Sequence, residues 1–283
     1  MDGLDGLKSY PLARRGMMMT GLISGLTLAV TPVEAQVIHT GADGLDAGET
    51  KIPTSEGSLP AYYARPSGAG PFPTVLVIEE IFGVHEYIKD TCRRLAHAGY
   101  LAVAPELYAR IGDLSGMTDV TAIVRDVISK APDDRMLEDL DSTAVWAAGN
   151  KGDPARLAVT GFCRGGRDVW MYDAHNPNLK AAVAWYGPIK GQPSPIQPTN
   201  PGDIAADIKA PLLGMYGAQD TGIAVPDVQA AAAKARTAGK TVDIVVYPDA
   251  PHGFHADYRP SYRKADAEDG WNRMLAWFKK YGV

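Results

Sequence analysis

A cysteine lies among glycines in the segment L-A-V-T-G-F-C-R-G-G-R at residues 157–167. An apolar, β-branched run leads into this segment, and a helical pattern follows it. A thiolate is a strong nucleophile, and the G-x-C-x-G turn exposes Cys163 at the end of a strand. The glycines let strand and helix pass closely without Cβ clashes. The helix N-terminus favours the negative charge of the thiolate, so Cys163 is a candidate nucleophile.

An acid and a histidine follow two later apolar runs of the chain. Asp220 comes directly after the first of these runs, and His252 comes directly after the second. A histidine that is oriented by a carboxylate can activate a nucleophile or a water molecule. Cys163, Asp220 and His252 together therefore predict a triad for acyl transfer.

Each member of this triad has a structural alternative. Cys163 could be a packing residue, Asp220 could cap the next helix, and His255 could take the place of His252. We favour His252 because it immediately follows the strand-end turn. The order nucleophile, acid, histidine is that of the α/β-hydrolases.

The elements that must position these residues alternate along the chain. Patterns predict strands at 60–65, 74–79, 100–105, 157–162, 181–186, 211–217 and 241–248, and helices at 85–98, 118–130, 134–148, 164–175, 225–238 and 262–281, with Asp133 as an N-cap. This alternation predicts one α/β domain with a mainly parallel central sheet and helices on both faces. Active sites in such sheets lie at the carboxyl ends of the strands, where the three candidate residues fall.

The composition is that of a soluble globular protein. The chain has 283 residues, of which 46% are hydrophobic and 22% charged, and its net charge is −5. This length allows a substantial core. The mildly acidic balance argues against nucleic acid as a partner, because nucleic-acid binding favours a basic face.

The N-terminus predicts an export signal. Arg14 and Arg15 precede a short apolar stretch, and small residues then mark a cleavage site before Gln36. The stretch is too short to span a membrane, and the paired arginines favour the twin-arginine route. We therefore expect residues 1–35 to be removed and residues 36–283 to form the mature periplasmic domain, with no membrane attachment after cleavage. The alternative is an internal start or a frayed amphipathic end.

The remaining cysteine and the histidines predict no further chemistry. Cys92 lies in a helical pattern and is expected to be a small buried apolar residue. A protein of this size needs no disulfide for stability. The histidines do not pair with cysteines or carboxylates at ligand spacing, so we predict neither a metal site nor a cofactor.

Several segments also carry a family resemblance. They are E-E-I-F-G-V (79–84), A-P-E-L-Y-A-R (104–110), G-F-C-R-G-G-R (161–167), A-V-A-W-Y-G (182–187), G-A-Q-D (217–220) and H-G-F (252–254). Through them the chain resembles the dienelactone hydrolase family, within the α/β-hydrolase fold, over roughly residues 55–280. The resemblance implies a triad of Cys163, His252 and Asp220.

The resemblance implies further roles around the nucleophile. Glu80 would take the proton from the thiol when substrate binds, and the backbone N–H groups of Ile81 and Arg164 would form the oxyanion hole. The turn chemistry independently requires the Arg164 donor. A surface salt bridge is the alternative for Glu80, but a glutamate that ends an apolar strand is costly without a task or a partner.

The chain departs from the family at the substrate carboxylate. The lactone hydrolases of the family hold this group with arginines, one of them in an H-x-F-A-R arrangement. Ala256 stands at that position here, whereas Arg259 follows closely and could reach the same space. Arg125 only lies near the second expected arginine. Arg259, Tyr186 and Tyr108 are the candidate substrate-binding residues, and dienelactone itself is doubtful as the substrate.

We therefore expect a hydrolase of small carboxylic esters or lactones that forms an acyl-enzyme on Cys163. The protein would be a monomer or a small homo-oligomer. One alternative is a periplasmic thiol redox sensor, but this function gives Glu80, Asp220 and His252 no reason to converge. Another alternative is a binding module with a degenerate site, and the complete triad argues against it.

Overall fold

A computed structural model describes residues 38–283, so the expected export signal at residues 1–35 and its cleavage site before Gln36 lie outside the described residues. The strands are β1 (Leu45–Thr54), β2 (Gly57–Pro66), β3 (Phe72–Ile78), β4 (Leu101–Pro105), β5 (Gly152–Phe162), β6 (Ala181–Trp185), β7 (Leu212–Gly217) and β8 (Val242–Tyr247). The α-helices are α2 (Glu86–His97), α3 (Val120–Asp126), α4 (Asp133–Gly149), α5 (Arg164–His175), α6 (Pro201–Ile204), α7 (Val225–Thr237) and α8 (Lys264–Lys280), with 3₁₀ turns η1 (Ile128–Lys130) and η2 (Ala205–Asp207).

The strands of the described residues form one sheet in the order β1-β2-β4-β3-β5-β6-β7-β8. β2 runs antiparallel to both β1 and β4, and all the other neighbours are parallel. The parallel strands β3, β4 and β6 are buried or nearly so along their whole length, as strands covered on both faces should be. The predicted mainly parallel sheet is confirmed.

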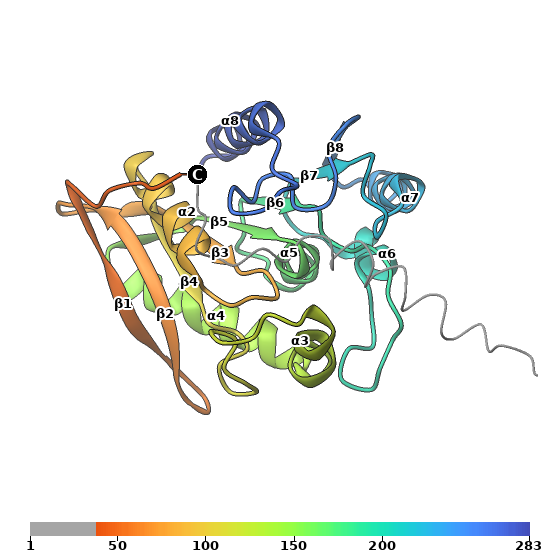
Figure 1. Cartoon of the computed structure of the whole chain (residues 1–283). Helices are drawn as coiled ribbons and strands as arrows, with labels where there is room; N and C mark the ends of the chain where they lie inside the picture. The colour runs from red at the N-terminus through yellow and green to blue at the C-terminus, as the bar shows by residue number, and fades with distance from the viewer. Residues whose placement is uncertain (1–37) are drawn as a thin grey trace, which may run out of the picture.

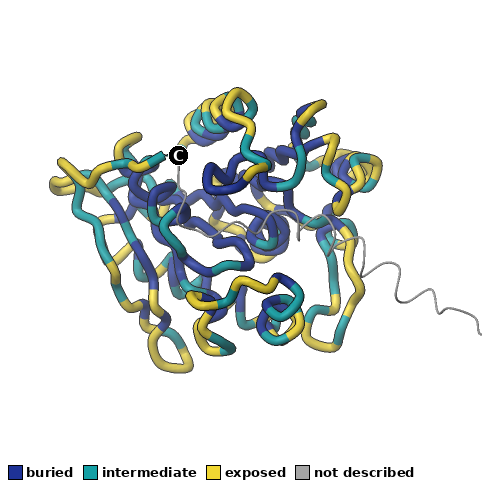
Figure 2. The backbone as a smooth tube through the Cα atoms, in the orientation of Figure 1, coloured by how far each residue is buried: buried dark blue, intermediate teal, exposed yellow. Residues whose placement is uncertain are grey.

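Helices cover both faces of this sheet (Figure 1). α2 and α8 lie together on one face, where the Arg94 guanidinium stacks 4.0 Å from the ring centre of Trp271. α4 and α5 lie together on the other face, where the Tyr172 hydroxyl donates to Asp141 at 3.0 Å. The sheet between these layers is the most deeply buried part of the chain (Figure 2). The predicted α/β domain with helices on both faces is therefore confirmed, and Cys92 is fully buried in α2 as expected.

Two sequence predictions about the helices are wrong. Asp133 is the first residue of α4 rather than its N-cap, which is Pro132. The Asp133 carboxylate instead accepts from the Arg167 guanidinium at 2.8 and 2.7 Å, a long-range partner that no local pattern reveals. The helix expected at 118–130 is interrupted, because α3 ends at Asp126 and the 3₁₀ turn η1 follows.

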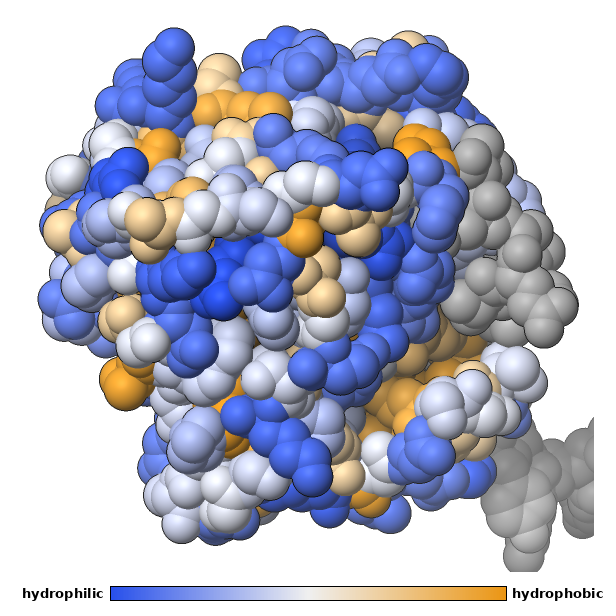
Figure 3. Space-filling view, turned by 90° about the vertical axis from the view of Figure 1, so that its left-hand side faces the viewer, coloured by the Kyte–Doolittle hydropathy of each residue, from blue (hydrophilic) through white to orange (hydrophobic). Residues whose placement is uncertain are grey.

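The edge strand β1 is absent from the sequence prediction. It has one fully buried residue, Ile52, and its other residues are intermediate or exposed, so it lacks the apolar run by which the central strands are recognised. Figure 3 shows the side of the molecule that carries β1 and β2, and this surface is mainly hydrophilic. Between residues 38 and 283, the structure contains no helix with the length and apolar character needed to cross a membrane.

Candidate active site

Cys163 occupies a strained corner between β5 and α5. Its backbone adopts φ +55° and ψ −118°, a conformation that residues with a side chain rarely take. The neighbouring chain is packed so closely that a Cβ atom on Gly161 would lie 2.4 Å from the Gly165 carbonyl oxygen. A Cβ atom on Gly165 would likewise lie 2.4 Å from the Glu79 carbonyl oxygen. The glycines of the motif are therefore required by the contact between the start of α5 and the end of β3.

The structure brings the three predicted triad residues together. His252 Nε2 lies 3.2 Å from Cys163 Sγ, and His252 Nδ1 lies 2.7 Å from Asp220 Oδ2. The second carboxylate oxygen of Asp220 accepts the backbone N–H groups of Gly222 and Ile223 at 2.8 and 3.2 Å. Asp220 is thus fixed by its own turn while it orients the imidazole, which is the geometry that nucleophilic catalysis needs.

The groups around His252 change the pKa of its imidazole ring. Burial by itself lowers the pKa of His252, but the negative charges of the Cys163 thiolate and of Asp220 more than offset that effect and raise the pKa to about 10. Cys163 is only 3% exposed, so these charges interact with little screening by solvent. The His252 ring is therefore held in its protonated form beside Cys163 Sγ.

His255, the alternative histidine, has a different environment. Its Nδ1 lies 2.6 Å from the Tyr87 hydroxyl, and its ring stacks on that of Phe162 with centroids 5.2 Å apart. Burial holds the pKa of His255 well below its usual value, so the ring is neutral. His255 is a hydrogen-bonded core residue, and His252 is the histidine beside the cysteine.

Glu80 is buried next to the site with three polar neighbours. Its Oε1 accepts from Arg259 Nη2 at 3.1 Å, its Oε2 accepts from the Tyr258 hydroxyl at 2.5 Å, and His85 Nε2 lies 3.7 Å from Oε2. Burial alone would raise the pKa of Glu80, but the Arg259 charge, followed by His85 and Tyr258, lowers it to about 2. Glu80 is therefore an ionised carboxylate inside the protein rather than part of a surface salt bridge.

The candidate substrate-binding residues are all buried. The Arg259 side chain is 0% exposed and is occupied by Glu80 and by the Tyr258 hydroxyl, 2.9 Å from its Nε. The Tyr186 ring meets that of His252 edge to face at 5.2 Å. The Tyr108 hydroxyl is buried without a hydrogen-bond partner in the described chain. Arg259 thus contacts Glu80, while Tyr186 is the candidate closest to the triad.

The two expected oxyanion donors belong to the same corner. Arg164 is the first residue of α5, so its N–H has no acceptor within the helix. Ile81 follows Glu80, three residues beyond the end of β3, which packs against the first turn of α5. Ile81 is buried in a small apolar cluster with Leu114 and Ile123. The two N–H groups are therefore carried by backbone segments that pack against each other.

Sequence reasoning missed two residues near the site. His85 lies five residues after Glu80 on the same turn, and this spacing was the available signal. Gln197, which accepts from Arg164 Nη1 at 3.3 Å, lies in a proline-rich loop and gave no signal. Across residues 38–283, no cluster of three or more His, Cys, Asp or Glu side chains is arranged to hold a metal ion.

Comparisons with known proteins identify the family of the chain. The family model described as "Dienelactone hydrolase family" matches residues 59–282. A carboxymethylenebutenolidase, so named, from Methylorubrum extorquens is 57% identical over 274 residues, 96% of this chain and 94% of its own length. An Escherichia coli protein with the same name is 52% identical over 266 residues, 94% of this chain and 98% of its own.

A solved structure extends the likeness to three dimensions. The crystal structure of a Klebsiella pneumoniae protein described as a dienelactone hydrolase has a TM-score of 0.82 and 54% sequence identity. The match covers 84% of this chain and 99% of that chain. A dienelactone hydrolase-like phosphotriesterase from metagenomic libraries, 20% identical with a TM-score of 0.67, shares the fold. The chain belongs to the dienelactone hydrolase family.

Proposed function

We propose that this protein hydrolyses small carboxylic esters or lactones through an acyl-enzyme on Cys163. The observation that carries the proposal is the chain of contacts from Cys163 Sγ to His252, 3.2 Å, and from His252 to Asp220, 2.7 Å. Close relatives bear the name carboxymethylenebutenolidase, which denotes a lactone hydrolase. The protein would act in the periplasm after removal of residues 1–35, and it would need no cofactor.

The first half-reaction forms the acyl-enzyme. The Cys163 thiolate attacks the substrate carbonyl carbon and forms a C–S bond, while the N–H groups of Ile81 and Arg164 stabilise the resulting oxyanion. Loss of one such donor costs about 100- to 1,000-fold in rate in other hydrolases. The tetrahedral intermediate then collapses, the C–O bond to the alcohol breaks, and the His252 imidazolium gives its proton to the leaving oxygen.

The second half-reaction releases the acid. Acylation removes the thiolate charge, which is the largest of the contributions that raise the pKa of His252. The pKa of the ring therefore falls, and the neutral imidazole that remains after the first proton transfer can take a proton from water. The hydroxide equivalent attacks the thioester, the C–S bond breaks, and the thiolate and imidazolium pair is restored while Asp220 keeps the ring oriented.

Glu80 requires a change of partner before it can act on the thiol. With a pKa of about 2 it is ionised but weakly basic while Arg259 and Tyr258 hold it. It would become a stronger base if its carboxylate exchanged Arg259 for the thiol as substrate entered. In the arrangement described here, His252 is the group in contact with the Cys163 sulfur, and Glu80 contacts Arg259 and Tyr258 instead.

The nucleophile also sets the substrate class. A thiolate is both a good nucleophile and a good leaving group, so it suits activated acyl groups such as enol lactones better than plain alkyl esters. A substrate carboxylate finds no arginine at position 256, which is alanine, and Arg259 already contacts Glu80 through Nη2. We therefore expect enol esters and lactones without an essential carboxylate to be preferred.

The test is a panel of lactones and aryl esters, assayed with the wild-type protein and with Cys163→Ala. The wild type should hydrolyse the activated members, and intact-mass measurement should trap an acyl adduct that the variant cannot form. Loss of the nucleophile should reduce kcat by at least about 10⁴-fold. Peroxide-dependent sulfenic acid on Cys163 without any turnover would instead support the redox alternative.

The location has its own test. Residues 1–35 fused to a reporter that is active only when exported folded should direct it to the periplasm. Replacement of Arg14 and Arg15 by lysine should abolish that export, since the twin-arginine route reads these residues. A reporter that stays in the cytoplasm with the wild-type segment would contradict the proposal.

A further inference from the structure

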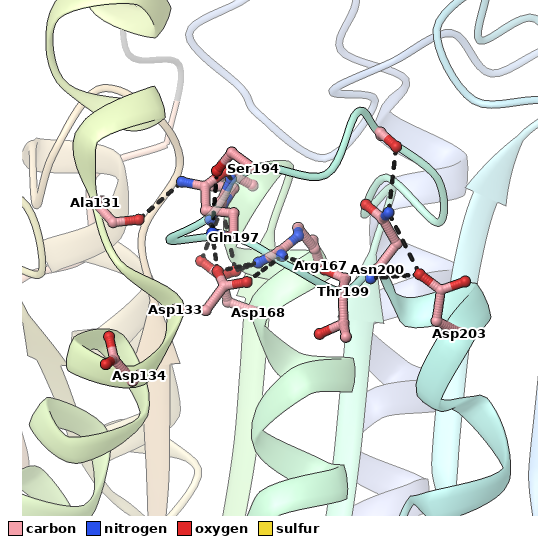
Figure 4. Close-up of polar contacts among 12 residues, drawn as sticks. Ala131, Asp133, Asp134, Arg167, Asp168, Ser194, Gln197, Thr199, Asn200 and Asp203 are labelled. Carbon is pink, nitrogen blue, oxygen red and sulfur yellow. Dashed lines mark hydrogen bonds and ion pairs between the residues drawn. The ribbon is translucent and has the colours of Figure 1, made fainter.

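Three segments that are far apart in the sequence meet around Arg167, four residues after Cys163 (Figure 4). They are the first two turns of α5, the start of α4, and the loop at residues 187–202 that follows β6. The loop begins against α5, where a Cβ atom on Gly187 would lie 2.2 Å from the Gly166 carbonyl carbon. The residue before it, Tyr186, packs on the catalytic histidine candidate, so the way the loop is held affects how the site is enclosed.

Arg167 links these three segments through hydrogen bonds. Its guanidinium donates to both carboxylate oxygens of Asp133 at 2.8 and 2.7 Å, to Asp168 at 2.8 Å and to the Thr199 carbonyl at 2.9 Å. Arg167 is buried together with both aspartates. Short, charge-assisted and bidentate contacts of this kind give a rigid geometry.

Arg164 is held more loosely by the same carboxylates. Its contacts to Asp168 are 3.2 and 3.3 Å long, and its contact to Asp133 is 3.3 Å. Both aspartates keep Arg167 if Arg164 moves away. Asp168, Asp133 and Gln197 therefore hold the Arg164 side chain together, through contacts of similar length.

Gln197 joins all three segments at once. Its amide nitrogen donates to the carbonyl oxygens of Ile128 and Ala131, both at 2.8 Å, directly before α4 (Figure 4 labels Ala131). Its amide oxygen accepts from Arg164 Nη1 at 3.3 Å. The side chain thus uses both of its hydrogens and its oxygen, and no substitution can reproduce all three contacts.

The rest of the loop is stiff, so it can transmit what happens at this side chain. Pro193, Pro195 and Pro198 fix φ on both sides of Gln197. The loop ends in a capping box at the start of α6, formed by Asn200 and Asp203. Gln197 shares the middle of the loop with two further contacts, from Arg167 to the Thr199 carbonyl and from the Asp133 N–H to the Ile196 carbonyl, both at 2.9 Å.

We propose that Gln197 is a positioning residue that holds the 187–202 loop closed beside Cys163 and thereby limits the size of the acyl group that the site accepts. The inference rests on the proposed hydrolase function. Gln197 touches no reacting atom in this scheme, since it acts through the loop and through Arg164. Its removal should therefore change substrate binding and size selectivity more than the chemical step.

The first test compares p-nitrophenyl esters from acetate to octanoate as substrates of the wild type and of Gln197→Ala. The variant should raise KM for the acetate about tenfold, the effect of losing one or two neutral hydrogen bonds, with kcat changed less than about threefold. Its preference should also move toward longer acyl chains. Unchanged KM values and an unchanged chain-length profile would overturn the inference, as would a fall in kcat with KM unaltered.

Two further variants separate the contacts of Gln197. Gln197→Glu keeps an acceptor for Arg164 but loses both donors and faces two carbonyl oxygens, so it should behave like Gln197→Ala. Gln192→Ala is the matched control, because Gln192 is an exposed glutamine of the same loop, and this variant should behave like the wild type. If Gln192→Ala reproduces the change, the effect belongs to the loop in general and the inference fails.

A second readout does not need turnover. The rate of alkylation of Cys163 is measured by mass spectrometry with iodoacetamide and with a bulky maleimide, and the fully buried Cys92 serves as the internal blank. Gln197→Ala should accelerate the bulky reagent more than the small one. If the wild type hydrolyses no ester, the proposed function fails and the inference fails with it; if the wild type hydrolyses esters but Gln197→Ala is alkylated like the wild type, only the inference fails. If Gln197→Ala does not fold, Gln197→Asn replaces it with the same expected results.

Discussion

Two buried charge clusters lie near Cys163, and they differ in how their charges are paired. In the first, Glu80 and Arg259 form one ion pair whose side chains are both 0% exposed. In the second, two arginines and two aspartates share their contacts, with Arg167 bonded to both Asp133 and Asp168. Each cluster is formally neutral. In the first cluster each ion has a single partner of opposite charge, whereas in the second each aspartate contacts both arginines.

This difference predicts opposite responses to a single substitution. Removal of one member of the isolated pair leaves a buried charge with no counter-ion, which is the most costly outcome for a buried ion pair. Removal of one arginine from the shared cluster leaves each aspartate with the other arginine. The isolated pair is therefore fragile, whereas the shared cluster is redundant. The predictions below test that contrast, in order of decreasing effect.

Arg259→Leu should produce the largest change in stability. It leaves the Glu80 carboxylate buried without its cation, and such a loss typically costs about 3–5 kcal/mol. The midpoint of urea unfolding should fall accordingly, with little change in the slope of the transition. The double variant Glu80→Leu/Arg259→Leu is the control, since it removes both charges and should recover most of the loss. A single variant as stable as the wild type would show that the pair is not isolated.

Low pH should weaken the Glu80–Arg259 ion pair, and this is the second-largest expected effect. The pKa of Glu80 is lowered from 4.5 to about 2 in the folded protein, so its contribution is fully present above pH 4.5 and is lost as the pH falls through about 2. The shift corresponds to about 3 kcal/mol. Unfolding free energies measured between neutral and low pH should therefore decline more for the wild type than for Glu80→Leu/Arg259→Leu. Parallel curves for the two proteins would contradict the assignment.

The triad should respond independently of both clusters. In Cys163→Ala the thiolate charge is gone, so the pKa of His252 should fall from about 10 by more than about one unit, or about 1.4 kcal/mol. The titration of the imidazole Hε1 resonance by NMR measures this shift. Arg164→Leu, which changes the shared cluster only, should leave the His252 titration close to that of the wild type. A larger effect of Arg164→Leu would mean that the clusters set the charge at the triad.

Arg164→Leu should give the smallest change in stability. Its contacts are 3.2–3.3 Å long, and Arg167 keeps both aspartates bonded, so the cost should be about 1 kcal/mol or less. Urea unfolding again measures it. Arg167→Leu, which removes the short contacts, is the comparison and should cost several times more. A loss for Arg164→Leu as large as the loss for Arg259→Leu would show that the shared cluster is not redundant.

Local patterns predicted the residues that lie at strand ends. Cys163, Asp220 and His252 each follow an apolar run, and the parallel sheet brings such positions to one edge. Glu80 was instead proposed from the family resemblance, although it too lies just beyond β3. The triad residues could be placed because their position depends on the strand pattern and on a fixed rule of sheet topology.

Partners across the fold could not be predicted in this way. Arg259 was assigned to substrate, yet its side chain lies against Glu80, 179 residues away along the chain. Asp133 was assigned to a helix cap, yet it bonds to Arg167, 34 residues away. Both side chains have the right chemistry for either role, and only the packed structure decides which counter-ion is within reach.

The backbone at Cys163 has a consequence for the evolution of the enzyme. Its φ of +55° is tolerated far better by glycine than by any residue with a Cβ atom. Glycine at position 163 would therefore cause less backbone strain than cysteine does. Drift toward greater stability would favour glycine at this position, which under the proposed mechanism would abolish turnover. A thiol at this corner is expected where selection for function outweighs selection for stability.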